Sequence, residues 1–186
     1  MENSIATLLK SKKTVFTPKD LLLLWQIENP DYLKTKIYRA VKSKQLIRLR
    51  RGIYVLDNSY NRLEMANKLI TPSYVSLQTI LAQNGVVFQY DSRVWSVASY
   101  NREITVDGQK YVYKKIKERA LFDNSGVINK ENASYASPER ALVDLLYLEK
   151  DAYFDNLDTI DLNKLLDIAK IYKNISLEKR VIQLKE

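Results

Sequence analysis

The chain of 186 residues contains no cysteine and no histidine. Without these side chains the protein can form no disulfide, no zinc site of thiolates or imidazoles, and no iron–sulfur cluster held by cysteine. The commonest general base is missing too, and with it every Ser-His-Asp or Cys-His catalytic arrangement. Any catalysis would have to rely on carboxylates, Lys or Tyr, together with a hard metal ion.

Glycine is scarce as well, and the four glycines stand far apart in the chain. A loop that cradles phosphate needs several glycines at short spacing, so neither common nucleotide-binding pattern is present. Three carboxylates, Asp91, Glu103 and Asp107, are the best set for a nuclease, but a hairpin turn at Asp107-Gly108 explains Asp107 better. We therefore expect no catalytic residue, no cofactor, no metal and no enzymatic activity.

Long apolar runs are also missing. The longest, Leu21 to Trp25, is far too short to span a bilayer. Three lysines, Lys10, Lys12 and Lys13, follow a brief amphipathic piece where a signal peptide would need an apolar core. Hydrophobic residues make up 46% of the chain and charged residues 28%, as in ordinary globular proteins. We expect a folded cytoplasmic protein that does not enter a membrane.

The positive charge is confined to one end of the chain. The first 56 residues carry twelve Lys and Arg but only four Asp and Glu, an excess that equals the net charge of +8 for the whole chain. The other 130 residues carry eighteen groups of each sign. Such a partition indicates a module that binds a polyanion, joined to an electroneutral body.

Two helix starts follow a short N-terminal helix. In Thr17-Pro18-Lys19-Asp20 the threonine can cap a helix, proline suits the first turn, and the aspartate complements the positive end of the helix dipole. Asn29-Pro30-Asp31 repeats the same pattern. The sequence therefore predicts a second helix through Leu21–Trp25 and a third helix from Pro30 to about Ser43 or Lys44.

The third helix has a buried stripe and an opposite face rich in cations. Leu33, Ile37, Ala40 and Val41 follow the helical spacing of an apolar stripe. The opposite face carries Thr35, Tyr38, Arg39 and Lys42, and Lys36 lies beside it. These five residues are predicted to contact DNA from this helix.

A basic hairpin follows the third helix. In LIRLRRGIYVL, Ile47 and Leu49 alternate with Arg48 and Arg50, Arg51-Gly52 allows a tight turn, and Ile53–Val55 returns as a strand. Three helices followed by a basic hairpin are the order of a winged helix-turn-helix. We therefore predict an α+β protein, with a winged helix-turn-helix at residues 1–57 and a small mixed α/β domain at residues 58–186.

The second part of the chain alternates helix and strand signals. The predicted helices cover residues 61–69 and 73–84, a segment that begins at Ser137-Pro138, and one or two segments after about Asp161. The predicted strands cover residues 86–88, 94–100, 104–106 and 111–116, with the Asp107-Gly108 turn between the last two.

Three blocks of sequence, RLRRGIYVL, TPSYVSLQTILAQNGVV and ASPERALVDLLYL, occur in the order found in a known family. Across roughly Phe16 to Leu148 the chain resembles the AbiEi antitoxins of type IV toxin–antitoxin systems, which are linked to abortive phage infection. The resemblance implies a winged helix that binds operator DNA, typically an inverted repeat, and represses its own operon. It also implies a body that counteracts a co-encoded toxin of the nucleotidyltransferase fold.

The residue types suggest how duplex DNA would be contacted. Thr35, Tyr38 and Arg39 are predicted to face bases, because arginine pairs with guanine and threonine reaches a base edge or a thymine methyl. Contacts to the backbone or the minor groove are predicted for the remaining cations, which fix register without reading sequence. These are Lys12, Lys13, Lys19, Lys36, Lys42, Arg48, Arg50 and Arg51.

Other interpretations stay open at this point. The cations can simply form a solvated helix face and an edge hairpin guarded by charge. The protein can also be a regulator without neutralising activity, or an interaction module whose basic end contacts RNA. A homodimer on an inverted repeat is possible, since palindromic operators mirror protein symmetry.

Overall fold

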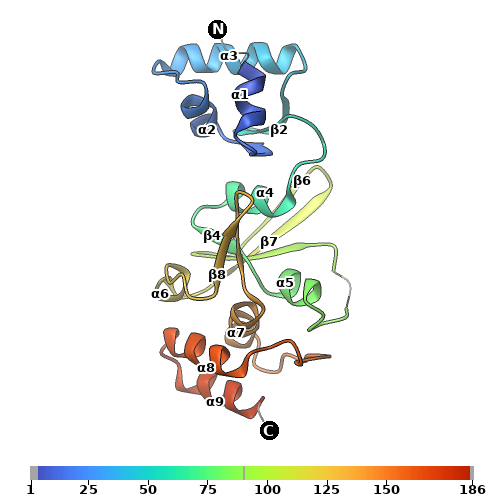
Figure 1. Ribbon diagram of the computed structural model, residues 1–186, viewed down its shortest axis with the longest axis vertical. Coiled ribbons are helices and arrows are strands. Elements are labelled where there is room, and N and C mark those ends of the chain that lie inside the picture. Colours follow the sequence, from blue (N-terminus) through green and yellow to red (C-terminus); the bar gives the residue numbers. More distant parts are fainter. Residues whose placement is uncertain (1–3, 90, 185–186) are drawn as a thin grey trace.

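The computed structural model describes residues 4–89 and 91–184 of the chain. Its parts follow one another along the longest axis (Figure 1). The N-terminal residues 4–56, here called the head, lie at one end. A six-stranded sheet lies in the middle, and the helices α7 to α9 lie at the other end. The mixed helix-and-sheet class expected from the sequence is confirmed, and a domain boundary after residue 57 stays a prediction.

The head combines three helices with a three-stranded antiparallel sheet in the order β1-β3-β2. Its elements are α1 (Ser4–Lys10), β1 (Val15–Phe16), α2 (Pro18–Leu24), α3 (Pro30–Lys42), β2 (Ile47–Arg50) and β3 (Ile53–Val55).

The predicted helix starts of the head are confirmed in detail. The Thr17 side chain accepts a hydrogen bond from the Asp20 N–H, and the Asp20 side chain accepts one from the Thr17 N–H, which is a complete capping box. Asn29 caps α3 by accepting from the N–H groups of Asp31 and Tyr32. At the hairpin turn, Gly52 has a φ of 80°, which a residue with a Cβ adopts only at a cost.

Leu33, Ile37 and Ala40 of the expected stripe are buried, and they pack with Leu8 and Leu21 into a separate small core of the head. Val41 is only half-buried, because it faces a groove described below.

The remainder of the chain, here called the body, is built on the six-stranded sheet β6-β7-β5-β4-β9-β8. The pairs β4·β9 and β5·β7 are parallel, and the other pairs are antiparallel. Its strands are β4 (Ser73–Val75), β5 (Val94–Ala98), β6 (Arg102–Val106), β7 (Gln109–Lys115), β8 (Val127–Lys130) and β9 (Ala133–Ala136). Its helices are α4 (Arg62–Leu69), α5 (Gln78–Gln83), α6 (Glu118–Leu121), α7 (Pro138–Leu148), α8 (Leu162–Ile171) and α9 (Ile175–Gln183).

Two sequence predictions for the body are wrong. The predicted helix at 73–84 begins only at Gln78, because Ser73–Val75 forms a strand that pairs with β5 on one side and β9 on the other. The predicted strand at 86–88 is a loop, and the carbonyl oxygen of Val86 accepts hydrogen bonds from the backbone of Asp155 and Asn156 instead of from a strand. In both places long-range pairing overrides the local pattern.

The sequence motifs TPSYVSLQ and SPERALVDL meet in the centre of the body. Arg140 of α7 is fully buried, and its Nε lies 3.1 Å from Oδ1 of Asp144 and 3.0 Å from the hydroxyl of Tyr74. Ser76 donates to Asp144 at 2.7 Å, and the Tyr172 hydroxyl after α8 donates to the same carboxylate. This network joins α7, the region of β4 and the C-terminal helices, so these motif residues are structural.

The helix α4 holds the head on the body. The carboxylate of Glu64 accepts from the backbone and the hydroxyl of Thr14, at 2.8 and 2.7 Å. One turn later, the Lys68 ammonium lies 2.8 Å from Asp20 of α2. Apolar contacts accompany these bonds, because Val15 and Val55 of the head sheet belong to the core of the body. The head is therefore packed onto the body and is more than a tethered module.

Candidate nucleic-acid interface

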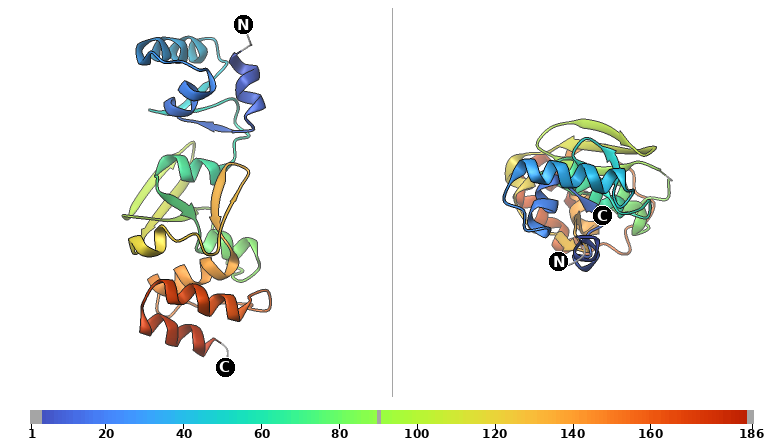
Figure 2. Two further views of the ribbon diagram at one scale, coloured as in Figure 1. Left: turned by 60° about the vertical axis from the view of Figure 1, so that its left-hand side comes forward. Right: turned by 90° about the horizontal axis from the view of Figure 1, so that it is seen from above.

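The outer face of α3 lies at the end of the molecule that points away from the body (Figure 1). Seen from above, α3 crosses this end of the molecule in front of the other elements (Figure 2). Thr35, Arg39 and Lys42 are exposed, and Tyr38 retains 66% of its accessible surface. The structure thus brings together on one outward face four of the side chains predicted to contact DNA.

These side chains are largely free to accept a ligand. Arg39 and Lys42 form no ion pair among the residues that the structure describes. Thr35 donates from its hydroxyl to the Asp31 carbonyl of the preceding turn at 3.1 Å, which fixes its rotamer. Asp31 is the sole acidic residue of α3 and pairs with Lys34 at the N-terminal end. The central and C-terminal turns therefore present positive charge alone.

Lys36 differs from the other predicted contacts of α3. Its ammonium lies 4.6 Å from the centre of the Trp25 ring, and partial burial lowers its pKa. Trp25 is itself held, because its indole nitrogen donates to the Ser4 carbonyl at 3.0 Å. Lys36 therefore lies on the flank of α3 that faces α2.

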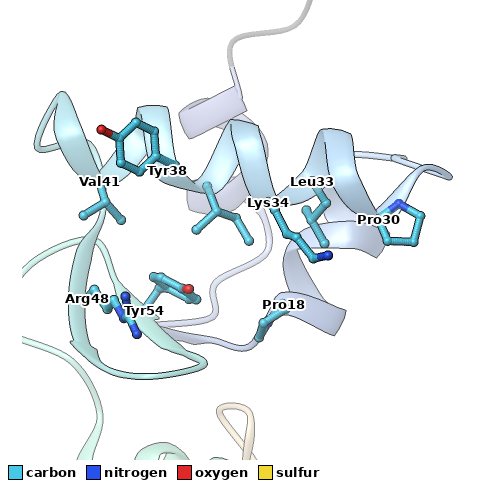
Figure 3. A pocket seen from close by; sticks show the side chains of 9 residues that line it. Pro18, Pro30, Leu33, Lys34, Tyr38, Val41, Arg48 and Tyr54 are labelled. Atoms are coloured by element: carbon cyan, nitrogen blue, oxygen red, sulfur yellow. The ribbon is translucent and has the colours of Figure 1, made fainter.

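The arginines of the β2–β3 hairpin point to different sides. Arg48 pairs with Tyr54 across the ladder, and both face α3 (Figure 3). A register shift follows, so that Arg50 lies opposite Ile53, which belongs to the core of the body. Residues directly opposite each other in an antiparallel pair lie on the same face of the sheet, so Arg50 lies on the face that Ile53 turns toward the body. Arg51 is exposed at the turn.

The lysines that precede α3 are not gathered on its outer face. Lys13 lies 2.5 Å from Asp20, which Lys68 of the body also contacts. The backbone carbonyl of Lys12 accepts from the side chain of Asn132 at the tip of the β8–β9 hairpin. Both residues thus lie where the head meets the body. Lys19 is exposed in the first turn of α2.

A groove of about 440 Å³ separates α3 from the β2–β3 hairpin (Figure 3), and we call it the α3 groove. Sequence reasoning did not find this groove, because it depends on how the hairpin folds back under the helix. Its lining residues are Pro18, Pro30, Leu33, Lys34, Ile37, Tyr38, Val41, Arg48 and Tyr54.

Two of the carboxylates considered for a nuclease site, Asp91 and Asp107, form hydrogen bonds with side chains of the body. The Arg93 guanidinium and the Trp95 indole N–H donate to Asp91, and together they hold its pKa at about 2. Asp107 forms the turn between β6 and β7 and accepts from the Tyr60 hydroxyl at 3.3 Å. Within the described residues, no group of three or more acidic side chains is placed to hold a metal ion. No helix in residues 4–89 and 91–184 is long and apolar enough to cross a bilayer.

Comparison with protein families gives a match that covers the head. Residues 3–56 match the family model described as "Transcriptional regulator, AbiEi antitoxin". The resemblance to the AbiEi family is confirmed for these residues, and its extension over the body to Leu148 stays a prediction. No curated protein matches the chain. The matched segment contains α3 and the β2–β3 hairpin, so the cationic face lies in the part that resembles these regulators.

Proposed function

We propose that the protein is a transcriptional autorepressor and antitoxin of a type IV toxin–antitoxin system, in which the head acts as a winged helix-turn-helix. The observation that carries this proposal is the outward face of α3 with Thr35, Arg39 and Lys42, which lies in the segment matched by the AbiEi regulators. In this proposal α3 enters the major groove of double-stranded operator DNA, and Arg48 contacts the backbone beside it.

The proposed division of labour follows from side-chain chemistry. Arg39 can form two parallel hydrogen bonds with guanine, and Thr35 and Tyr38 can reach neighbouring base edges. Lys42 and Arg48 carry charge toward phosphates, which adds affinity that weakens with salt. Because the head is packed onto the body, two copies on an inverted repeat would place their heads at a spacing set by the bodies.

The antitoxin part of the proposal rests on the resemblance of the body motifs. The partner would be a co-encoded toxin of the nucleotidyltransferase fold. Since the motif residues Tyr74, Ser76, Arg140 and Asp144 are buried, the resemblance points to a shared body fold and not to a contact patch. Neutralisation could act on the toxin directly or oppose its effect elsewhere.

Two experiments in cells separate the two roles. Repression is tested with a reporter driven by the protein's own promoter, and the protein should lower its output. Neutralisation is tested by co-expression with the neighbouring toxin gene, and growth should recover. Repression without recovery, with soluble protein present, would leave a regulator without neutralising activity. Recovery without repression would contradict the DNA-reading role.

A further inference from the structure

The α3 groove has the size and lining of a small-molecule site. Its volume of about 440 Å³ lies within the range of ligand pockets in proteins. Leu33, Ile37 and Val41 supply its apolar wall from α3, and Pro18 and Pro30 line it at the start of α2 and of α3 (Figure 3). A purely polar ligand would leave this wall in contact with water.

The polar side chains that line the groove favour an anion. They are Lys34, Tyr38, Arg48 and Tyr54, and each carries a hydrogen-bond donor. Among the residues that the structure describes, no Asp, Glu, Asn or Gln lines the groove. Arg48 forms no ion pair among the described residues. Lys34 pairs with Asp31 on the open surface, where both side chains are more than three-quarters exposed, so this pair competes weakly with a ligand.

We propose that the α3 groove binds a small organic acid with an apolar ring or short chain and one carboxylate. The Arg48 guanidinium and the Tyr54 hydroxyl, which are cross-strand partners, hold the carboxylate. The apolar part packs against Leu33, Ile37 and Val41. A neutral apolar compound would form no charge-assisted hydrogen bond with Arg48, and inorganic phosphate would leave the wall unfilled.

The consequence for regulation rests on the proposed function. Arg48 is also a proposed phosphate contact, and Tyr38 is a proposed base contact. An acid bound between them therefore competes with operator DNA and acts as an effector that releases it. Binding of the acid itself does not depend on whether the protein reads DNA.

Calorimetry of the full chain without DNA tests the site. The probes are benzoate, 2-naphthoate and decanoate, with 2-naphthalenemethanol as the neutral analogue of 2-naphthoate and inorganic phosphate as the bare anion. We expect saturable one-to-one binding of at least one acid. The neutral analogue of that acid and inorganic phosphate should each bind with an affinity about tenfold or more lower. Absence of binding by all three acids, or equal binding of phosphate, overturns the proposal.

Variants locate the site. Arg48→Gln should weaken the binding of the best acid by about tenfold. Val41→Phe should fill the groove and weaken the binding of this acid at least as much. Arg102→Gln, which changes an exposed arginine of β6, is the matched control and should leave binding unchanged. Thermal unfolding checks that each variant is folded. Parental affinity in both groove variants would place the acid elsewhere and overturn the proposal.

Operator binding then separates the two claims. At a concentration that saturates the parent, the acid should lower the affinity of the parent for the operator about tenfold. The same concentration should have little effect on the operator affinity of Arg48→Gln. If the acid binds and the operator affinity does not change, the effector role is overturned while the site stands. If no operator is bound at all, the proposed function fails, and the calorimetry still decides the groove.

Discussion

Arg39 lies in the last turn of α3 with its side chain exposed on the outward face. If it reads a base, Arg39→Ala should cost about 1–3 kcal/mol of binding free energy and relax the preference at a single base position. Anisotropy titrations of operator duplexes with every single-base change measure both effects. Arg102→Ala on the body is the matched control. Parental affinity and preference in Arg39→Ala would mean that α3 is not the reader.

At the same scale, the charge partition was the most informative feature of the sequence. It located the cations in the head, and the cap residues located α3, so the outward face with Arg39 and Lys42 could be predicted. The sequence could not show that Lys13 forms an ion pair with Asp20, or that the Lys36 ammonium lies over the Trp25 ring. Both contacts join residues from different elements, and no local pattern encodes them.

Among the elements, the β2–β3 hairpin divides its arginines between two sides. Arg48 faces α3, and Arg50 faces the body. Arg48→Ala should therefore weaken binding to all DNA sequences and lower the slope of log affinity against log salt by about one, because one phosphate contact is lost. Arg50→Ala should leave the slope nearly unchanged. Titrations at several salt concentrations compare the two, and equal losses would contradict this division.

The helix α7 depends on its buried ion pair. Asp144→Asn leaves Arg140 charged and without its carboxylate in a fully buried place, so it should lower the free energy of unfolding by about 3–5 kcal/mol. Replacing both residues with apolar ones of similar volume, as in Arg140→Met with Asp144→Leu, should recover little of the loss, because the buried hydroxyls of Tyr74, Ser76 and Tyr172 then lose their partner. Urea unfolding measures both variants. A loss below about 1 kcal/mol in Asp144→Asn would contradict the central role of this network.

The success of prediction differed between kinds of element. Helices α2, α3, α4, α7 and α8 carry side-chain caps that a sequence shows directly. The short strands β1, β4, β8 and β9 were missed. Strands β1, β4 and β9 pair with partners distant in the chain, whereas β8 pairs with the adjacent β9 in a short hairpin that the sequence prediction did not include. The groove beside α3 was missed for the same reason, because Tyr54 and Arg48 reach it only once the hairpin has folded back.

For the whole molecule, Asp20 connects the head with the body. Burial raises its pKa, but hydrogen bonds from Lys13, Lys68 and Thr17 outweigh burial and hold the pKa well below its usual range. A lowered pKa in the folded state adds stability above the pKa of the unfolded state, and that stability is lost as the pH falls toward the folded pKa. Asp20→Asn should thus lower stability by about 1–3 kcal/mol at pH 7.

The pH dependence makes the Asp20 prediction specific. The difference between the parent and Asp20→Asn should shrink progressively below about pH 4, the range in which an ordinary Asp titrates. Urea unfolding at pH 7, 5, 4 and 3 measures the free energy of unfolding of both proteins, and hence this difference. Asp31→Asn, which affects an exposed pair, is the control and should change stability by less than about 1 kcal/mol. A difference for Asp20→Asn that stays constant with pH would contradict the ion-pair explanation.

The central claim, that the head reads duplex DNA, is tested most directly by fluorescence anisotropy of the full chain with duplexes tiled across its own promoter. A shuffled duplex and an RNA of the same sequence serve as competitors, and each titration is repeated at several salt concentrations. We expect one promoter segment to bind about 10³-fold or more tightly than the shuffled duplex. Equal and steeply salt-dependent binding to every duplex and to RNA would contradict sequence reading and leave only a surface for polyanions.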